Sequence, residues 1–191
     1  MKGEVRTKNV LISNIFSRFF ISILPAVFAV IILYLLGPEI YMPALRIFLA
    51  FYFALGVGWI LSPALALASG IHPVGIVILL VFISSQSSLI VSANYPLLEK
   101  IPYLGLYVKS LRKKAESIIK EKELVEKAGY LSIFWLMFLP VYGTGPNVMT
   151  LAGRLLAFEW KRVWLTVTLS ATVRFSIITI LLYFGYLKIG V

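Results

Sequence analysis

The ten residues "LPVYGTGPNV", Leu139 to Val148, contain two prolines and two glycines between two strongly apolar runs, "YLSIFWLMF" and "MTLAGRLLAF". Proline removes a backbone donor and glycine lowers helix stability, so this stretch interrupts an otherwise apolar segment. Non-helical backbone at membrane depth is tolerated only where protein buries it or water reaches it. The stretch therefore predicts the tip of a re-entrant helical hairpin that faces a polar cavity. The alternative is a proline kink in a helix that crosses the membrane once.

The composition of the whole chain is typical of an integral membrane protein. Its 191 residues are 60% hydrophobic and its mean hydropathy is +0.95, whereas soluble domains are about 45–50% apolar. We expect an all-α polytopic fold in a single membrane domain, residues 1–191. The chain has no Cys, one His and no Asp, which excludes disulfides and thiol catalysis and leaves little for a metal centre or a catalytic triad. We therefore expect no enzyme, no cofactor and no metal site.

Five apolar blocks lie along the chain, and a helix needs about 20 residues to cross the hydrocarbon core. The blocks are 19–36, 44–69, 73–94, 129–158 and 163–187. The net charge of +10 arises from Lys and Arg that cluster beside these blocks, which is a topology signal and predicts no nucleic-acid partner. A charged stretch, 97–128, has apolar residues at spacings of three and four. This spacing predicts an amphipathic helix on the cytoplasmic membrane surface.

The distribution of Lys and Arg distinguishes two topologies. With a basic, cytoplasmic N-terminus, one crossing by every block would place 97–128 outside, against the positive-inside tendency. If blocks 44–69 and 129–158 are both re-entrant, the three basic segments, at the N-terminus, in 97–128 and at Lys161 and Arg162, all lie in the cytoplasm. The sequence thus predicts three full transmembrane helices and two opposed re-entrant hairpins. They form an inverted repeat, with repeat one at 44–94 and repeat two at 129–187.

Each predicted hairpin contains a Gly/Pro break, which is the sequence pointer to the binding site in transporters built from inverted repeats. The first hairpin is expected to consist of half-helices 44–56 and 60–70, and the second of 129–139 and 146–158. We assign the breaks to Gly56, Gly58, Pro63, Pro140 and Pro146.

Arg174 lies near the middle of block 163–187, where a charge costs at least about 2.5–3.5 kcal/mol on insertion scales. We expect its guanidinium to bind hairpin-tip carbonyls together with an anionic substrate. A purely structural clamp on the tip is the alternative. Arg154 is expected either to join Arg174 around a phosphate or to extend to the inner membrane surface.

The second break supplies further donors for an anion. A half-helix that starts near Asn147 presents its N-terminus to the cavity, which favours negative charge. We assign to substrate binding, besides the two arginines, Gly143, Thr144, Gly145, Asn147 and Gln86. Gln86 belongs to the polar segment "SSQSS", residues 84–88, whose hydroxyls have an alternative use in bonds to neighbouring helices.

These motifs resemble the small multi-drug export protein family, which is related to the DedA/VTT superfamily. The resemblance covers roughly residues 61–185 and rests on "ALALASGIHP", on "PVYGTGP" and on "LAGRLLAF". In the first hairpin the family often carries an acidic–basic–Pro element. Here "GWILSPALA" keeps Pro63 without a charge, so the resemblance does not extend to that acidic residue.

The residues and the resemblance together lead to one expected function and two alternatives. We expect a plasma-membrane transporter or lipid translocase with a cytoplasmic N-terminus, for an anionic, phosphate-bearing substrate that can be a lipid. The resemblance also implies an exporter of drugs or other small molecules, and a membrane organiser without transport is the third reading. Membrane lipids are expected partners, and a homo-oligomer is left open.

Overall fold

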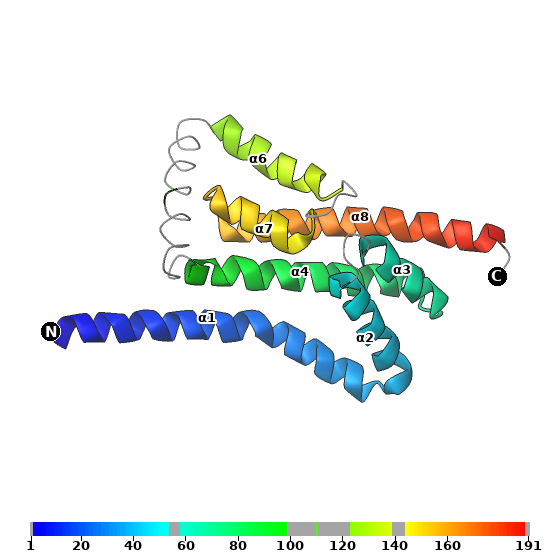
Figure 1. Ribbon diagram of the computed structural model, residues 1–191, viewed down its shortest axis with the longest axis horizontal. Coiled ribbons are helices and arrows are strands. Elements are labelled where there is room, and N and C mark those ends of the chain that lie inside the picture. Colours follow the sequence, from blue (N-terminus) through cyan, green and yellow to red (C-terminus); the bar gives the residue numbers. More distant parts are fainter. Residues whose placement is uncertain (1, 54–57, 99–109, 111–122, 139–143, 190–191) are drawn as a thin grey trace.

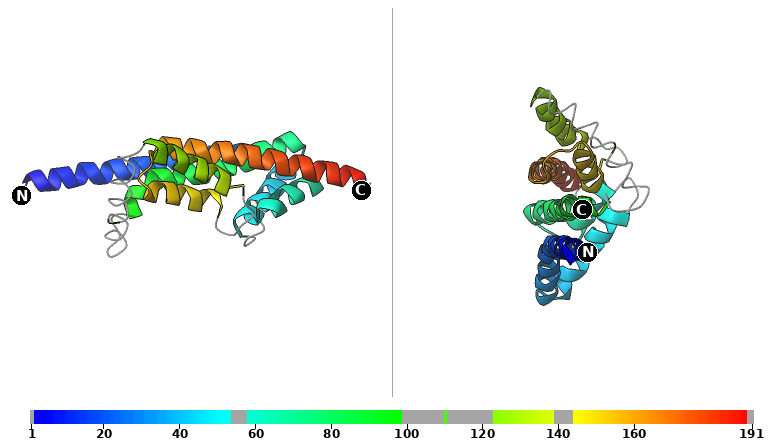
Figure 2. Two further views of the ribbon diagram at one scale, coloured as in Figure 1. Left: turned by 90° about the horizontal axis from the view of Figure 1, so that it is seen from above. Right: turned by 90° about the vertical axis from the view of Figure 1, so that its left-hand side faces the viewer.

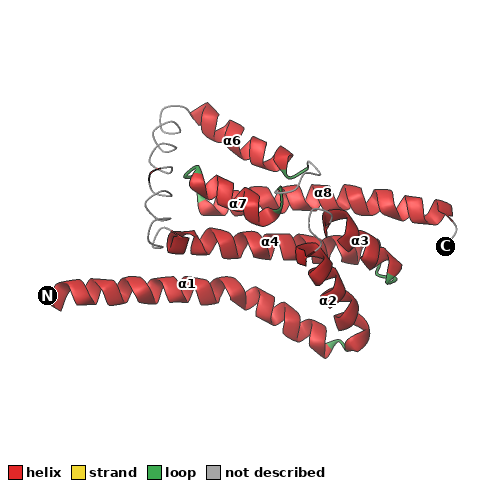
Figure 3. Ribbon diagram, in the orientation of Figure 1, coloured by secondary structure: helices red, strands yellow, loops and turns green. Residues whose placement is uncertain are grey.

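The computed structural model describes residues 2–53, 58–98, 110, 123–138 and 144–189. The regular structure of these residues is entirely helical (Figure 1, Figure 3). The helices are α1 (Lys2–Leu35), α2 (Pro38–Phe53), α3 (Gly58–Ala68), α4 (Pro73–Leu98), α6 (Glu123–Leu136), α7 (Pro146–Leu155) and α8 (Trp160–Ile189). The prediction of an all-α protein is confirmed.

Among the described residues, two helices are long and apolar enough to cross a membrane. Pro73–Pro96 in α4 has 24 residues, and Trp160–Gly185 in α8 has 26 residues. They correspond to the predicted spans 73–94 and 163–187. The third predicted span, 19–36, corresponds to Phe19–Leu35, a shorter apolar part of α1.

The helices α4 and α8 pack against each other along their length and form the centre of the molecule. Leu80 and Ile76 of α4 are buried together with Val163, Val167 and Ala171 of α8. Figure 2 shows α1, α4 and α8 side by side in a row, with α7 and α2 beside this row on one side. The start of α1 and the end of α8 lie at opposite ends of the long axis.

Two helix pairs approach this centre from opposite ends (Figure 1). The helices α2 and α3 lie at one end and pack closely on each other. The helices α6 and α7 lie at the other end, where α7 packs mainly on α4, and α6 packs on α8. In each pair, the ends that adjoin the undescribed segments 54–57 and 139–143 point toward the middle of α8.

Glycine allows the first pair to pack tightly. Gly58 is the first residue of α3, and a Cβ atom there would lie 2.7 Å from the carbonyl oxygens of Ala50 and Phe51 in α2. Real Cβ atoms do not approach backbone oxygens this closely, so only glycine fits without a shift. Gly58 is therefore at the close approach of the two helices, as expected for a residue beside the break.

The break residues are otherwise placed as follows. Pro146 begins α7, where its missing N–H costs no helical hydrogen bond. Pro63 lies inside α3, so its assignment to the break is wrong. A helix tolerates one lost backbone bond when tertiary packing supports it, and Pro63 is fully buried. Gly56 and Pro140 lie outside the described residues.

The expected half-helices differ from the observed helices mainly at their outer ends. The helix α2 begins at Pro38 rather than at residue 44, and it continues through Pro43. The helix α7 ends at Leu155, and Ala157 at φ 63° separates it from α8. The predicted surface helix 97–128 lies mostly outside the described residues, and its last part belongs to the first turns of α6.

Candidate functional site

Arg174 is buried in the middle of α8, with 5% of its surface exposed. Its Nη1 donates a hydrogen bond of 2.6 Å to the carbonyl oxygen of Met137, the residue that follows α6. The last carbonyls of a helix have no partner within the helix, and the C-terminal end carries partial negative charge. The guanidinium therefore caps α6 and anchors the inner end of the α6–α7 pair to α8. Met137 precedes by three residues Pro140, where the sequence predicts the tip of a hairpin.

Phe175, which follows Arg174, connects the same part of α8 to the α2–α3 pair. The ring of Phe175 lies 6.1 Å from the ring of Phe51 in α2, measured between centroids, and Phe175 itself is buried. One turn of α8 thus contacts the inner ends of both α6 and α2. The Arg174 guanidinium carbon lies 6.0 Å from the Phe175 ring centre, so the cation lies among aromatic rings and backbone dipoles.

The start of α7 contains several of the residues that the sequence assigns to substrate binding. Gly145 occupies the N-cap with φ −71° and ψ 166°, and it offers no side-chain cap. Thr144 is buried, whereas Asn147 is exposed. A Cβ at Gly145 would meet no atom within 4 Å, and its φ is one that any residue adopts. The backbone therefore does not require glycine at position 145, while Gly143 lies outside the described residues.

Arg154 is at the opposite end of α7 from these donors. Its Nη1 donates a hydrogen bond of 2.6 Å to the carbonyl oxygen of Phe158, and its guanidinium carbon lies 5.1 Å from the ring centre of Tyr95 in α4. A Cβ at the adjacent Gly153 would lie 2.9 Å from Val163 near the start of α8. Arg174 follows Val163 by eleven residues on that helix, about 16 Å along its axis. The two guanidinium groups thus bond to carbonyls at different places, that of Arg154 to Phe158 and that of Arg174 to Met137.

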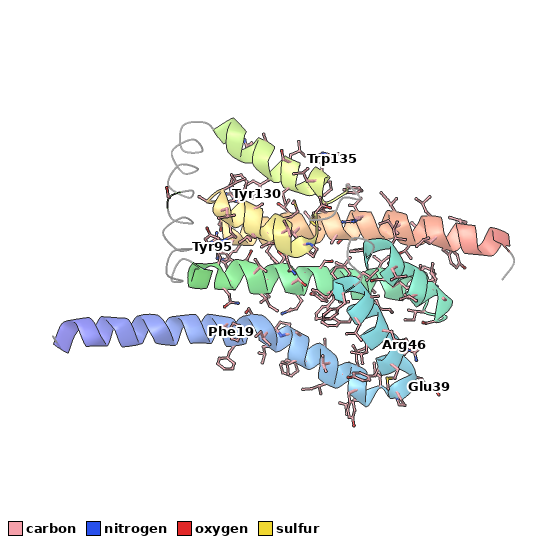
Figure 4. The ribbon with its side chains drawn as sticks, in the orientation of Figure 1. Phe19, Glu39, Arg46, Tyr95, Tyr130 and Trp135 are labelled. Atoms are coloured by element: carbon pink, nitrogen blue, oxygen red, sulfur yellow. The ribbon has the colours of Figure 1, made fainter. Side chains whose placement is uncertain are left out.

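The aromatic residues around Arg154 mark one end of the molecule. Figure 4 shows Tyr95 and Tyr130 at the same end, the end at which α4 finishes and α6 begins. The Tyr130 ring lies 4.6 Å from the Phe158 ring between centroids, and its hydroxyl accepts a hydrogen bond of 3.2 Å from the Glu159 N–H. Glu39 and Arg46 of α2 lie toward the other end.

The segment "SSQSS" of α4 bonds to four other helices. Ser85 accepts hydrogen bonds from Trp164 and Thr168 of α8, at 3.0 and 3.1 Å. Gln86 donates to the Ser22 carbonyl of α1. The Ser87 hydroxyl bonds to Tyr52 of α2, and Ser88 accepts a 2.7 Å bond from Thr150 of α7.

In these bonds the polar side chains of the segment link neighbouring helices, which is the alternative role given for them above. The structure places Gln86 at the contact with α1, apart from Arg174, so Gln86 serves here as a helix-to-helix link. The sequence reasoning missed Thr150, Tyr95 and Trp164. Polar atoms inside apolar blocks were the available signal, because such atoms require a partner in the membrane.

No protein-family model, curated protein or solved structure matches the chain. In the part of the chain that the structure describes, all regular structure is helical, and two helices are long and apolar enough to cross a membrane. Its candidate site is a buried arginine where two opposed helix pairs end.

Proposed function

We propose that the chain is a membrane transporter or lipid translocase whose anionic, phosphate-bearing substrate binds near Arg174. In this proposal α4, α8 and the apolar part of α1 cross the bilayer. The pairs α2–α3 and α6–α7 are re-entrant hairpins from opposite sides, related as an inverted repeat. Such repeats place the substrate near the bilayer midplane, between broken helices. The resemblance to the small multi-drug export family and the DedA/VTT superfamily, whose members are linked to lipid movement, agrees with this assignment.

The observation that carries the proposal is the position of Arg174. Its guanidinium contacts the end of α6, and the adjoining Phe175 contacts α2. The segments 40–98, 127–158 and 160–191 contain neither Asp nor Glu. A cation among apolar segments without carboxylates creates a positive potential, which attracts anions and repels cations. A planar guanidinium is also suited to phosphate oxygens.

The test is transport by the purified chain in liposomes. A labelled anionic phospholipid and a labelled polyprenyl phosphate are compared with the cationic dye ethidium, each against protein-free liposomes. The proposal predicts protein-dependent movement of an anionic lipid and no movement of the dye. Movement of the dye alone would contradict it and would favour the small-molecule exporter that the resemblance also implies. Movement of neither would favour the membrane organiser.

A further inference from the structure

The interface between α4 and α7 contains polar groups that the site at Arg174 does not use. Thr150 of α7 donates a hydrogen bond of 2.7 Å to Ser88 of α4, and both residues are fully buried. One turn later on α7, Arg154 lies over the ring of Tyr95. Both contacts advance in the same direction along the two helices, so α7 runs parallel to α4. They also identify the face of α4 that is turned toward α7.

Ser84 and Ser92 share this face of α4. They precede and follow Ser88 by four residues, a spacing that places side chains on one side of a helix. Both are buried, with 0% and 2% of their surface exposed. Neither hydroxyl has a hydrogen-bond partner among the residues that the structure describes. Buried polar atoms without a partner are uncommon, and they point to a water or a ligand that completes them.

Several other helical hydroxyls of this chain behave differently, although the buried Thr179 of α8 also lacks a partner among the described residues. Five of them donate to the carbonyl four residues earlier: Ser69, Ser87, Ser132, Thr168 and Thr172. This local bond is the ordinary way in which a helix satisfies Ser and Thr in an apolar setting. Ser84 and Ser92 do not make it, although they lie deeper than Ser69 or Ser132. Their hydroxyl groups are thus available to a partner in the α4–α7 interface.

We name this interface the polar seam and define it by Ser84, Ser88 and Ser92 of α4 with Thr150 and Arg154 of α7. In α7, Thr150 lies in the second turn and Arg154 in the last.

We propose that the polar seam is the path by which the phosphate-bearing headgroup passes between Arg174 and the membrane surface beside Arg154, and that it opens when α7 moves away from α4. This inference rests on the proposed transport function. In the structure the seam is closed by the bond between Thr150 and Ser88. When α7 moves away from α4, the freed hydroxyls can bond to water or to phosphate oxygens, whereas apolar side chains at such an interface would gain no hydrogen bonds. Arg154 at the outer end of the seam attracts the anion.

A reversible cross-link tests the opening, since the native chain has no Cys. The hydroxyl oxygens of Ser88 and Thr150 are 2.7 Å apart, so cysteine sulfurs at these two positions would lie within reach of each other. Oxidation of the Ser88→Cys/Thr150→Cys variant with copper phenanthroline should lower anionic lipid transport by about tenfold or more, because the closed state is locked. A reductant should restore transport.

The matched control is Ser85→Cys/Thr168→Cys, which links α4 to α8. Its hydroxyl oxygens are 3.1 Å apart, and α8 is not expected to leave α4. Its cross-link should leave transport at the rate of the reduced protein. Full transport by the oxidised Ser88/Thr150 variant would overturn the proposal, as would a failure of that pair to cross-link while the control pair does.

A second measurement tests whether water reaches the polar seam, and it does not depend on transport. Single Ser84→Cys and Ser92→Cys variants are treated in membranes with a negatively charged, impermeant methanethiosulfonate, which reacts with hydrated thiolates. Ile83→Cys is the control, because Ile83 is buried among apolar residues. Both seam positions should react from the cytoplasmic side, and faster than position 83. Equal rates would overturn the seam even if lipid transport is observed. If the native chain moves no lipid, the proposed function fails while the labelling still reports on the seam.

Discussion

At the scale of single residues, Arg174 combines a structural contact with the proposed binding role. Its hydrogen bond to Met137 caps α6, and removing the guanidinium leaves a buried carbonyl without that donor, at a cost of about 1–3 kcal/mol. Lys at this position would keep the charge but lose the planar fork. We predict that Arg174→Lys lowers anionic lipid transport and that Arg174→Gln lowers it further. Transport is measured in liposomes, alongside thermal unfolding in detergent.

The control is Arg162→Gln at the start of α8. Arg162 is exposed and pairs with Glu159 at 3.1 Å, an interaction worth at most about 1 kcal/mol. The Arg162→Gln variant should therefore transport lipid at about the native rate and unfold at about the native temperature. If Arg174→Gln is less stable yet transports at the native rate, Arg174 is a structural clamp and the binding role is refuted.

At the scale of the elements, the α2–α3 pair depends on Gly58. Alanine there would place its Cβ 2.7 Å from two carbonyl oxygens of α2, and overpacking of this kind typically costs about 1–3 kcal/mol. We predict that Gly58→Ala lowers the unfolding temperature in detergent. Gly75→Ala is the matched control in α4, where the nearest atom would be 3.4 Å away. That change should be neutral or stabilising because alanine favours helices. An equal response of the two variants would contradict the close packing.

Helix identity could be predicted from the sequence more readily than helix ends. Apolar blocks of suitable length indicated α4 and α8, and Pro146 indicated the start of α7. Pro63 was misplaced because a proline also occurs inside helices whose packing compensates for one lost bond, and Pro25, Pro43 and Pro96 are further examples here. Local sequence does not contain that packing, so a Gly/Pro pattern locates a break only to within several residues.

At the scale of the whole molecule, the sequence identified Arg174 but not its surroundings. A lone charge in an apolar block can be recognised from composition. The bond from Arg174 to Met137 depends on where the end of α6 lies against α8. The position of Arg154, at the far end of α7 from Arg174, follows from the parallel packing of α7 on α4. The polar seam depends on the same packing. Serines four apart were visible in the sequence, but the helix they face was not.

The topology of the whole chain is open to a direct test with single cysteines in a Cys-free background. The proposed inverted repeat places Ser110 and Lys161 in the cytoplasm, because the stretch 97–128 and the start of α8 carry clustered Lys and Arg. Both residues are exposed. His72, between α3 and α4, is exposed at the other end of α4, and it should lie outside.

An impermeant maleimide applied to intact cells should therefore label His72→Cys and leave Ser110→Cys and Lys161→Cys unmodified until the membrane is opened. Labelling of position 72 shows that the reagent reaches the outer face. Because α4 crosses the membrane once between position 72 and the charged stretch 97–128, these two positions lie on opposite sides. Labelling of Ser110→Cys from outside would therefore place position 72 inside, and α2 and α3 would have to cross the membrane as one kinked helix. That outcome would refute the opposed hairpins, and with them the placement of Arg174 between two hairpin ends.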